Sequence, residues 1–185
     1  MAEKITYGIK NVYAAKITNT NGAITFGTPV ALPGASEITL STAGEDVRIY
    51  ADNVVYYKTG VNQGYTGTLS LYAIPDAFYT DYLGYIKDDN DVLVEAADGA
   101  KADFALLFEF DTDTAKTKRT VLYNVTASRP EISSSTKEDT IDPQPFAIPI
   151  TASPAIDTGY VKASIVGDED DETWAGWFTA VYTTA

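Results

Sequence analysis

Two runs of apolar residues flank a polar loop between positions 104 and 126, which is the pattern of a β-hairpin. Successive side chains of a strand point to opposite faces. The even positions from Phe104 to Phe110 are all apolar, and the odd positions between them carry a single acid, Glu109. A strand pair that is apolar on both faces needs cover on both sides. A chain of this size has limited means of covering both, so we expect neighbouring subunits to do so.

The segment 42–67 holds two further strand-like runs, Val47–Tyr50 and Val54–Tyr57, separated by Ala-Asp-Asn. The second run is apolar on both faces, yet polar and glycine-rich sequence follows it. Two interpretations stay open. The segment is either a hairpin packed on the core of its own subunit, or an extended loop or hairpin whose apolar side chains only a partner subunit covers. In the second case the interface residues are Val54, Val55, Tyr56 and Tyr57.

One amphipathic helix is predicted at about residues 75–86. Pro75 suits a first helical position, and Asp76 suits the positive N-terminal end of the helix dipole. Phe78, Tyr82 and Ile86 follow at intervals of four and therefore share one face. We expect this apolar stripe to lie on the sheet.

The rest of the chain reads as strands and turns, because Tyr, Phe, Thr and Val favour strands and Gly and Pro supply turns. The sequence therefore predicts a mainly β fold, a β-sandwich or half-open barrel flanked by the one helix. We expect a single domain over residues 1–185, with a short N-terminal arm at 1–8 and an exposed, mobile polar segment at 128–140.

Two local features carry further expectations. Proline lacks the N–H that a central strand donates, so Pro149 should confine its strand, Phe146–Ile150, to a sheet edge. The aromatic run Trp174–Val181 is predicted to form the last strand.

Composition narrows the function classes. The chain has no cysteine and no histidine, which removes thiolate nucleophiles, the usual zinc ligands and any Ser-His-Asp triad. Its 26 acidic residues follow no catalytic motif, and its glycines do not match the motif of a phosphate-binding loop. We expect neither an enzyme nor a cofactor. No run approaches the ~18 apolar residues of a membrane span, and Met1–Thr6 lacks the apolar stretch of a signal peptide, so we expect no membrane insertion and folding in the cytosol.

Two acid-rich stretches raise the question of calcium. An EF-hand loop needs oxygen ligands at positions 1, 3 and 5, glycine at 6 and glutamate at 12. Loops counted from Asp88 and from Asp168 lack both the glycine and the glutamate. We expect no metal site; the stretch Asp168–Glu172 reads as a solvated loop, with adventitious binding of a divalent cation as the alternative.

The aromatic residues near the C-terminus also allow two interpretations. They form either part of a core or interface, or a flat platform of the kind that binds sugars in a monomeric β-sandwich binding module for carbohydrate or a cell surface. The residues concerned are Tyr160, Trp174, Trp177 and Tyr182.

The charge balance bears on nucleic acid. The chain has 13 basic and 26 acidic residues, so its net charge is −13. Binding to the phosphates of nucleic acid requires Lys and Arg, so this charge argues against a nucleic-acid-binding role. An acidic surface suits a protein that lets DNA pass without holding it, although solubility alone would also explain it. The one basic cluster, Lys116, Lys118 and Arg119, falls at the hairpin turn, where we expect a solvated tip or ion pairs with the acids of an adjacent subunit.

Several strings along the chain, taken in their order and spacing, resemble the major tail (tail-tube) proteins of long-tailed, non-contractile bacteriophages. The main ones are Ala105–Asp111 and Arg119–Pro130 in the hairpin. The others are Tyr7–Asn11, Pro29–Gly34, Tyr50–Asn53, Asn62–Tyr65, Ile74–Asp76, Ser135–Glu138, Thr151–Pro154 and Gly176–Phe178.

This resemblance implies a tail-tube fold and a structural virion protein. Members of the family form stacked, typically six-membered rings, and the resulting tube conducts genome DNA at ejection. In such proteins the segment equivalent to 42–67 contacts the next ring. The implied partners are further copies of the chain and the tape measure, tail terminator and distal tail proteins, with assembly in the host cytoplasm and a final place in the virion tail. A related inner-tube protein of a contractile or secretion-type injection system is the other structural interpretation.

Overall fold

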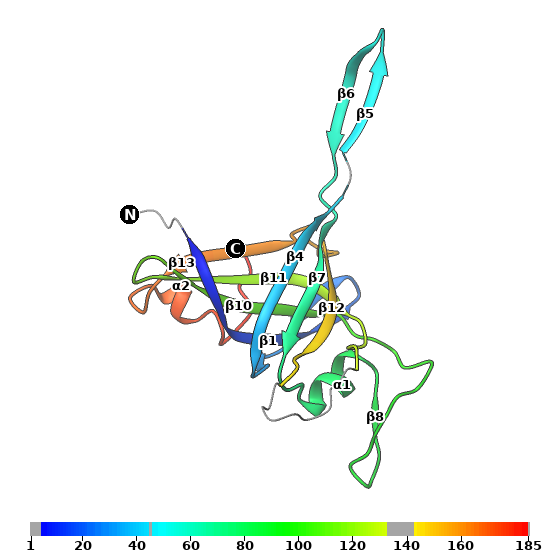
Figure 1. Cartoon of the computed structure of the whole chain (residues 1–185), viewed down its shortest axis with the longest axis vertical. Helices are drawn as coiled ribbons and strands as arrows, with labels where there is room; N and C mark the ends of the chain where they lie inside the picture. Colours follow the sequence, from blue (N-terminus) through cyan, green and yellow to red (C-terminus); the bar gives the residue numbers. More distant parts are fainter. Residues whose placement is uncertain (1–4, 45, 133–142, 185) are drawn as a thin grey trace.

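One large antiparallel sheet forms the body of the protein in the computed structural model, which describes residues 5–44, 46–132 and 143–184 (Figure 1). Its main path runs through β2 (Ala23–Phe26), β1 (Thr6–Thr20), β10 (Phe104–Thr112), β11 (Thr117–Ala127), β12 (Phe146–Ser153), β7 (Gly64–Leu71) and β4 (Ala35–Ala43). Beside this path, β13 (Lys162–Gly167) pairs with β11 and β3 (Val30–Ala31) pairs with β1. The remaining elements are β5 (Asp46–Ala51), β6 (Val54–Gly60), α1 (Asp76–Tyr82), β8 (Ile86–Lys87), β9 (Leu93–Val94) and α2 (Glu172–Ala175).

The sheet curls into a half-open barrel, which confirms the predicted mainly β architecture. β1 and β4 stand far apart in the strand order, yet they contact each other, and β4 crosses in front of β1 in Figure 1. No ladder joins these two strands among the described residues, so the barrel stays open on this side.

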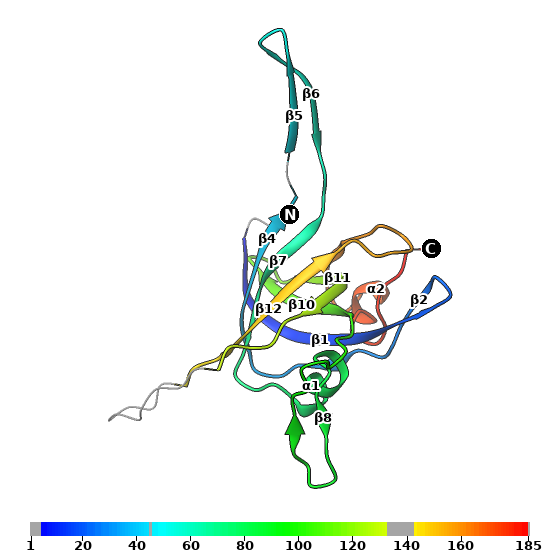
Figure 2. The same cartoon turned by 90° about the vertical axis from the view of Figure 1, so that its right-hand side faces the viewer.

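Two bulges in β1 help to produce the curl. The pairing with β10 slips between Tyr7 and Ile9 and again between Lys10 and Tyr13. Each slip holds a residue with positive φ, Gly8 at 59° and Asn11 at 51°. Bulges increase local twist and bend the strand. Figure 2 shows β1 as a long curved strand that passes under the body of the sheet.

An inner core fills the concave side of the sheet. The even positions of β10 and facing residues of β7, β11 and β12 supply most of it. Helix α1 covers one end, where the ring of Phe104 lies 4.7 Å from that of Tyr82 and 5.7 Å from that of Phe78, centroid to centroid. The predicted helix is therefore confirmed but shorter than 75–86. It stops before Gly84, whose φ is +74°, and Ile86 lies exposed in β8 and not on the buried stripe.

An outer core covers the opposite face of the same hairpin. Ala105 and Leu107 of β10 and Val121 and Tyr123 of β11 pack there against the C-terminal segment. Buried members of that segment include Trp177 and Val181. The expectation that neighbouring subunits cover this face is therefore wrong, because the last part of the chain folds back over it.

This C-terminal segment is not the predicted strand. The carboxylate of Asp171 accepts hydrogen bonds from the backbone N–H groups of Thr173 and Trp174, at 2.9 and 3.1 Å, and so caps the short helix α2. Beyond α2 the chain continues without regular structure across the outer core (Figure 1). The aromatic side chains of this run thus pack on the sheet without forming a strand of it.

Strand β12 lies inside the sheet, between β11 and β7, so the prediction that Pro149 marks an edge is wrong. The ladder with β11 ends at the pair Ala127 and Ile150. Pro149 follows just beyond that pair, and its carbonyl oxygen accepts a hydrogen bond from the Ser128 N–H at 2.8 Å. The missing proline N–H therefore falls where the ladder ends.

The structure describes only part of each of the two segments that were expected to be loose. Residues 1–4 of the predicted arm lie outside the described residues, but Thr6 and Tyr7 pair with Thr112 and Asp111, so β1 begins inside the stretch 1–8. Within the polar segment 128–140, residues 133–140 also lie outside the described residues. The Glu131 N–H still donates to the carbonyl oxygen of Ala147.

Candidate assembly surfaces

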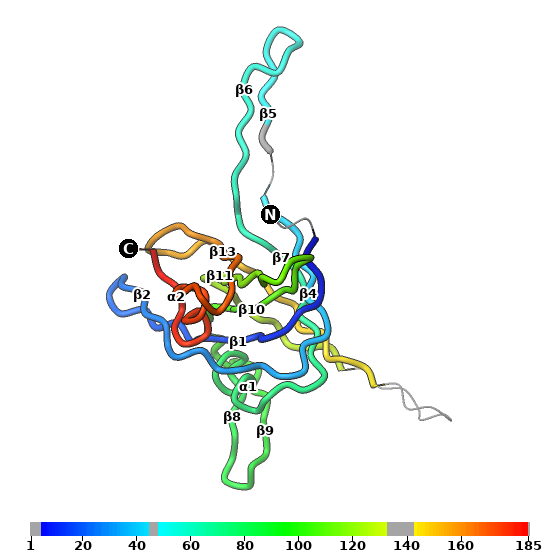
Figure 3. The backbone as a smooth tube through the Cα atoms, turned by 90° about the vertical axis from the view of Figure 1, so that its left-hand side faces the viewer, coloured from blue at the N-terminus to red at the C-terminus, as the bar shows by residue number. Residues whose placement is uncertain are grey.

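The hairpin β5–β6 projects from the body of the protein, as all views of the backbone show (Figures 1, 2 and 3). Its large apolar side chains are exposed, and Tyr56 keeps 77% of its surface in contact with solvent. The exposed set comprises Ile49, Tyr50, Val54, Val55, Tyr56 and Tyr57. The interpretation in which this hairpin packs on the core of its own subunit is wrong. The predicted extended hairpin is confirmed, and its four predicted interface residues lie together on β6.

Register divides these side chains between two faces, because residues opposite each other on paired strands share a face. Ile49 pairs with Tyr57 and Ala51 with Val54, which gives one wholly uncharged face. Arg48 pairs with Lys58 and Tyr50 with Val55, which gives the other face two cations below an apolar end. A register shift at Tyr56 separates the two halves.

The turn explains how the hairpin forms without support from the body. Asp52 and Asn53 both have positive φ, 51° and 64°, as the type I′ turns of two-residue hairpins require. A lone two-stranded hairpin is nevertheless only marginally stable in water. Contact with another molecule would remove the exposed apolar surface and add stability.

A second, smaller hairpin, β8–β9, stands at the opposite end of the molecule from β5–β6 (Figures 1 and 3). Ile86 pairs with Val94, and both are exposed together with Val92. The sequence pattern did not predict this surface, and the acids from Asp88 onwards were considered as a calcium-binding loop. The signal available was the apolar triplet Val92-Leu-Val94 after an acidic turn.

Asp88 organises the turn of this hairpin. Its Oδ1 accepts hydrogen bonds from the N–H groups of Asn90, at 2.9 Å, and of Val92, at 2.8 Å. These bonds, the one from Val92 above all, hold the pKa of the Asp88 carboxyl below its usual value. Asp91, with φ of 63°, places its carboxylate 3.2 Å from the Nζ of Lys87.

Two members of the basic cluster at the turn of β10–β11, Arg119 and Lys116, form contacts within the subunit. Arg119 is buried, with 8% of its surface exposed, and its Nε donates to Glu109 Oε2 at 2.8 Å. Its guanidinium lies 3.3 Å from the centroid of the Trp174 ring and also donates to the Trp174 carbonyl. Lys116 Nζ lies 3.1 Å from Asp168 Oδ2 of the same chain, and this pair, through the hydrogen bond first, lowers the pKa of Asp168.

Lys118, the third member of that cluster, lines a groove of about 360 Å³ on the open side of the barrel. The groove lies between β4 and β7 on one side and β10, β11 and β13 on the other. Its apolar lining includes Ile38, Leu40 and Phe110, and Lys162 donates from Nζ to the Tyr65 hydroxyl at 3.1 Å across it.

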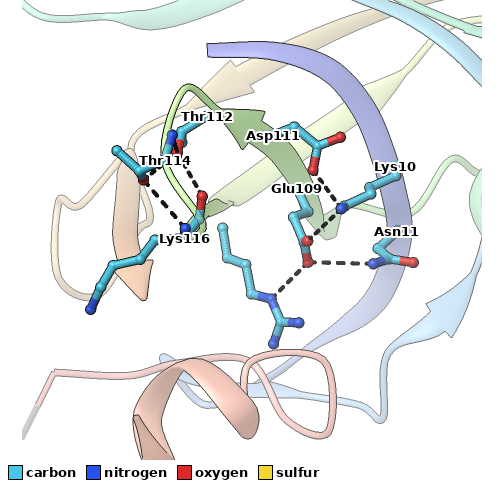
Figure 4. A network of polar contacts seen from close by, with 8 residues as sticks. Lys10, Asn11, Glu109, Asp111, Thr112, Thr114 and Lys116 are labelled. Atoms are coloured by element: carbon cyan, nitrogen blue, oxygen red, sulfur yellow. Dashed lines mark hydrogen bonds and ion pairs between the residues drawn. The ribbon is translucent and has the colours of Figure 1, made fainter. Parts of the chain in front are cut away.

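A polar network surrounds Glu109, a buried acid on the outer face of β10 (Figure 4). Only 2% of Glu109 is exposed, and it also accepts a hydrogen bond from Asn11 Nδ2 at 3.3 Å, while Lys10 Nζ lies 3.4 Å away. The bulge at Asn11 turns that amide towards the carboxylate (Figure 4). The hydrogen bond from Lys10 to Asp111, followed by the Glu109 charge, raises the pKa of Lys10 against the opposing effect of burial. Each charge in this network has a partner in the chain, which is the arrangement of a structural core.

The predicted aromatic platform does not exist as a surface. Trp174 and Trp177 are buried, with 9% and 2% exposed, and belong to the packing around the C-terminal segment. Trp177 stacks on Tyr182 with 5.3 Å between ring centroids. Neither indole face is open to a sugar ring, so the carbohydrate-binding interpretation loses the residues on which it was built.

Neither a metal site nor a membrane span is formed by the residues that the structure describes. No three acidic side chains there gather closely enough to hold an ion. Within 168–172, Asp168 pairs with Lys116 and Asp171 caps α2. In the same described part of the chain, no helix is long and apolar enough to cross a membrane.

Comparison with known protein families gives one match that spans nearly the whole chain. The family described as phage tail tube protein matches residues 2–166. The matched range takes in both projecting hairpins and the strands of the sheet. No curated protein matches the chain.

Proposed function

The chain belongs to the phage tail tube protein family, and from this premise we propose that it assembles with copies of itself into stacked, six-membered rings that form the tail tube. The hairpin β5–β6 is the observation that carries this proposal. It extends beyond the body and exposes aromatic and aliphatic side chains that the subunit does not cover. Aromatic residues of this kind are enriched at protein–protein interfaces. Val54, Val55, Tyr56 and Tyr57 are the proposed contact between rings.

Contacts within a ring are proposed to use sheet edges. β4 spans Ala35–Ala43 and is paired with β7 on one side, while no described strand pairs with its other side. A long unpaired edge is a template for pairing with another chain. When the surface that meets it lies elsewhere on the next copy, the contact is head-to-tail, and a suitable rotation closes it into a ring.

The tube would conduct genome DNA at ejection without specific binding. The net charge of −13 supports this role, because an acidic wall repels phosphates. The proposed partners beyond further copies are the tape measure, tail terminator and distal tail proteins. Assembly would take place in the host cytoplasm, and the product belongs to the virion tail. The role is structural and requires no catalysis.

Negative-stain electron microscopy and sedimentation velocity of the purified protein test this proposal. Rings or tubes are expected at high concentration, or after addition of the tail initiation proteins that present a first ring. A strictly monomeric particle at every concentration, with the initiators present, would overturn it.

A further inference from the structure

We propose that the uncharged face of β5–β6 in one copy docks on the exposed apolar face of β8–β9 in the next copy. This inference rests on the proposed function and names the partner surface of the projecting hairpin. The donor face comprises Ile49, Val54 and Tyr57, and the acceptor face comprises Ile86, Val92 and Val94.

Position is the first argument. The two hairpins stand at opposite ends of the long axis of the molecule (Figures 1 and 3). A contact that joins one end of a copy to the other end of the next is heterologous, and without a closing rotation it extends into an open stack. Each copy then uses both hairpins once, as a tube of unlimited length requires.

Matching chemistry is the second argument. Both surfaces are hairpin faces with three large apolar side chains, and each of these side chains is close to half exposed or more in the isolated subunit. Burying such side chains against each other removes apolar area from water, which is the main driving force of association. Neither hairpin packs its face on the body, so docking requires no prior rearrangement.

Charge is the third argument. Arg48 and Lys58 lie together on the second face of the donor hairpin, away from the docking face. The docking face carries no charged side chain, so the contact would bury no ionised group of the donor, which would be costly.

Complementary variants test the pairing. The donor variant is Ile49→Asp/Tyr57→Asp, the acceptor variant is Ile86→Asp/Val94→Asp, and the control is Ile156→Asp, another exposed apolar residue, in the connection between β12 and β13. Each variant alone should stay unstacked, whereas the control should form tubes like the wild type. A 1:1 mixture of donor and acceptor variants keeps one intact contact, so it should give two-layer stacks and no longer ones.

The outcomes separate the two proposals. Tubes formed by the acceptor variant would overturn the docking inference and leave the tail-tube role intact. The same holds if the mixture stays unstacked while circular dichroism shows both variants to be folded. A wild type that never associates, with initiators present, would overturn the proposed function itself.

Cross-linking tests the same contact without weakening it. The chain contains no cysteine, so Val54→Cys combined with Val92→Cys places the only two thiols on the proposed donor and acceptor. A short bismaleimide should convert assembled protein into a ladder of covalent oligomers. The pair Val54→Cys and Ile156→Cys should give no ladder. Equal ladders from both pairs, or none from the first, would contradict the contact.

Discussion

At the scale of single residues, the Arg119 side chain links strand β10 to the C-terminal segment in the outer core. Its guanidinium joins Glu109 of β10 to the Trp174 carbonyl of α2 and lies under the rings of Trp174 and Phe178, at 3.3 and 4.6 Å from the centroids. The planar group can form hydrogen bonds at its edge while its faces stack on aromatic rings, which a lysine ammonium cannot do. The C-terminal segment thus packs on the Arg119 guanidinium, although the sequence pattern predicted Arg119 to lie at an exposed hairpin tip.

Replacing Arg119 should destabilise the fold strongly. Arg119→Met leaves the Glu109 carboxylate buried without its main partner, and breaking a buried pair in this way costs about 3–5 kcal/mol. Urea unfolding followed by tryptophan fluorescence measures the change. The matched control is Arg48→Met on the exposed hairpin, expected to change stability by less than about 0.5 kcal/mol. Equal stability of the two variants would show that the buried pair contributes nothing.

Burial of Tyr82 gives the fold a dependence on alkaline pH. Burial, helped by the neighbouring Asp81 carboxylate, raises the pKa of Tyr82 from 10.0 to about 12. The stabilising effect of the neutral phenol is therefore complete below pH 10, declines above it and is lost near pH 12. Tyr82→Phe should show a smaller fall in the free energy of unfolding between pH 9 and pH 11, whereas Tyr56→Phe, at an exposed position, should fall like the wild type. An identical fall in all three proteins would refute this assignment.

At the scale of elements, the sequence identified the β10–β11 hairpin, the projecting hairpin and α1, because alternation and helical spacing are local properties. It could not identify which segment covers an apolar face. The apolar odd positions of β10 need cover. A neighbouring subunit and the C-terminal segment of the same chain could both supply it, and the sequence alone does not distinguish them. Arg119 shows the same limit, since its burial depends on α2, 55 residues away.

Loss of two side chains on the projecting hairpin should stop stacking and leave the subunit folded. Val55 and Tyr57 are both at least half exposed, so Val55→Ser/Tyr57→Ser removes no part of either core. The thermal unfolding midpoint should stay close to that of the wild type, while electron microscopy should show no stacked rings. Val30→Ser, at another exposed position, is the control and should stack normally. An unfolded double variant would mean that the hairpin supports the body.

At the scale of the whole molecule, charge and shape act together. A subunit with net charge −13 repels its copies at long range, and the proposed contact between the two projecting hairpins opposes this repulsion at short range. Charges beyond about 10 Å are screened at 0.1 M salt. The net charge could be read from the sequence, but the placement of the two hairpins at opposite ends of the molecule could not, because it follows from the path of the sheet.

Binding to duplex DNA should be undetectable at physiological salt and should not appear when the salt is lowered. Non-specific affinity comes from basic groups that displace counterions from phosphates, and it grows as salt falls. Within the one basic cluster of the sequence, two of the three cations are already engaged, because Arg119 is buried against Glu109 and Lys116 is paired with Asp168. Electrophoretic mobility shift with subunit and with assembled protein, from 50 to 200 mM salt, measures this, and a basic DNA-binding protein serves as the positive control. Micromolar affinity that falls steeply with salt would show a basic track on the assembled surface, and the tube could then no longer be a passive conduit.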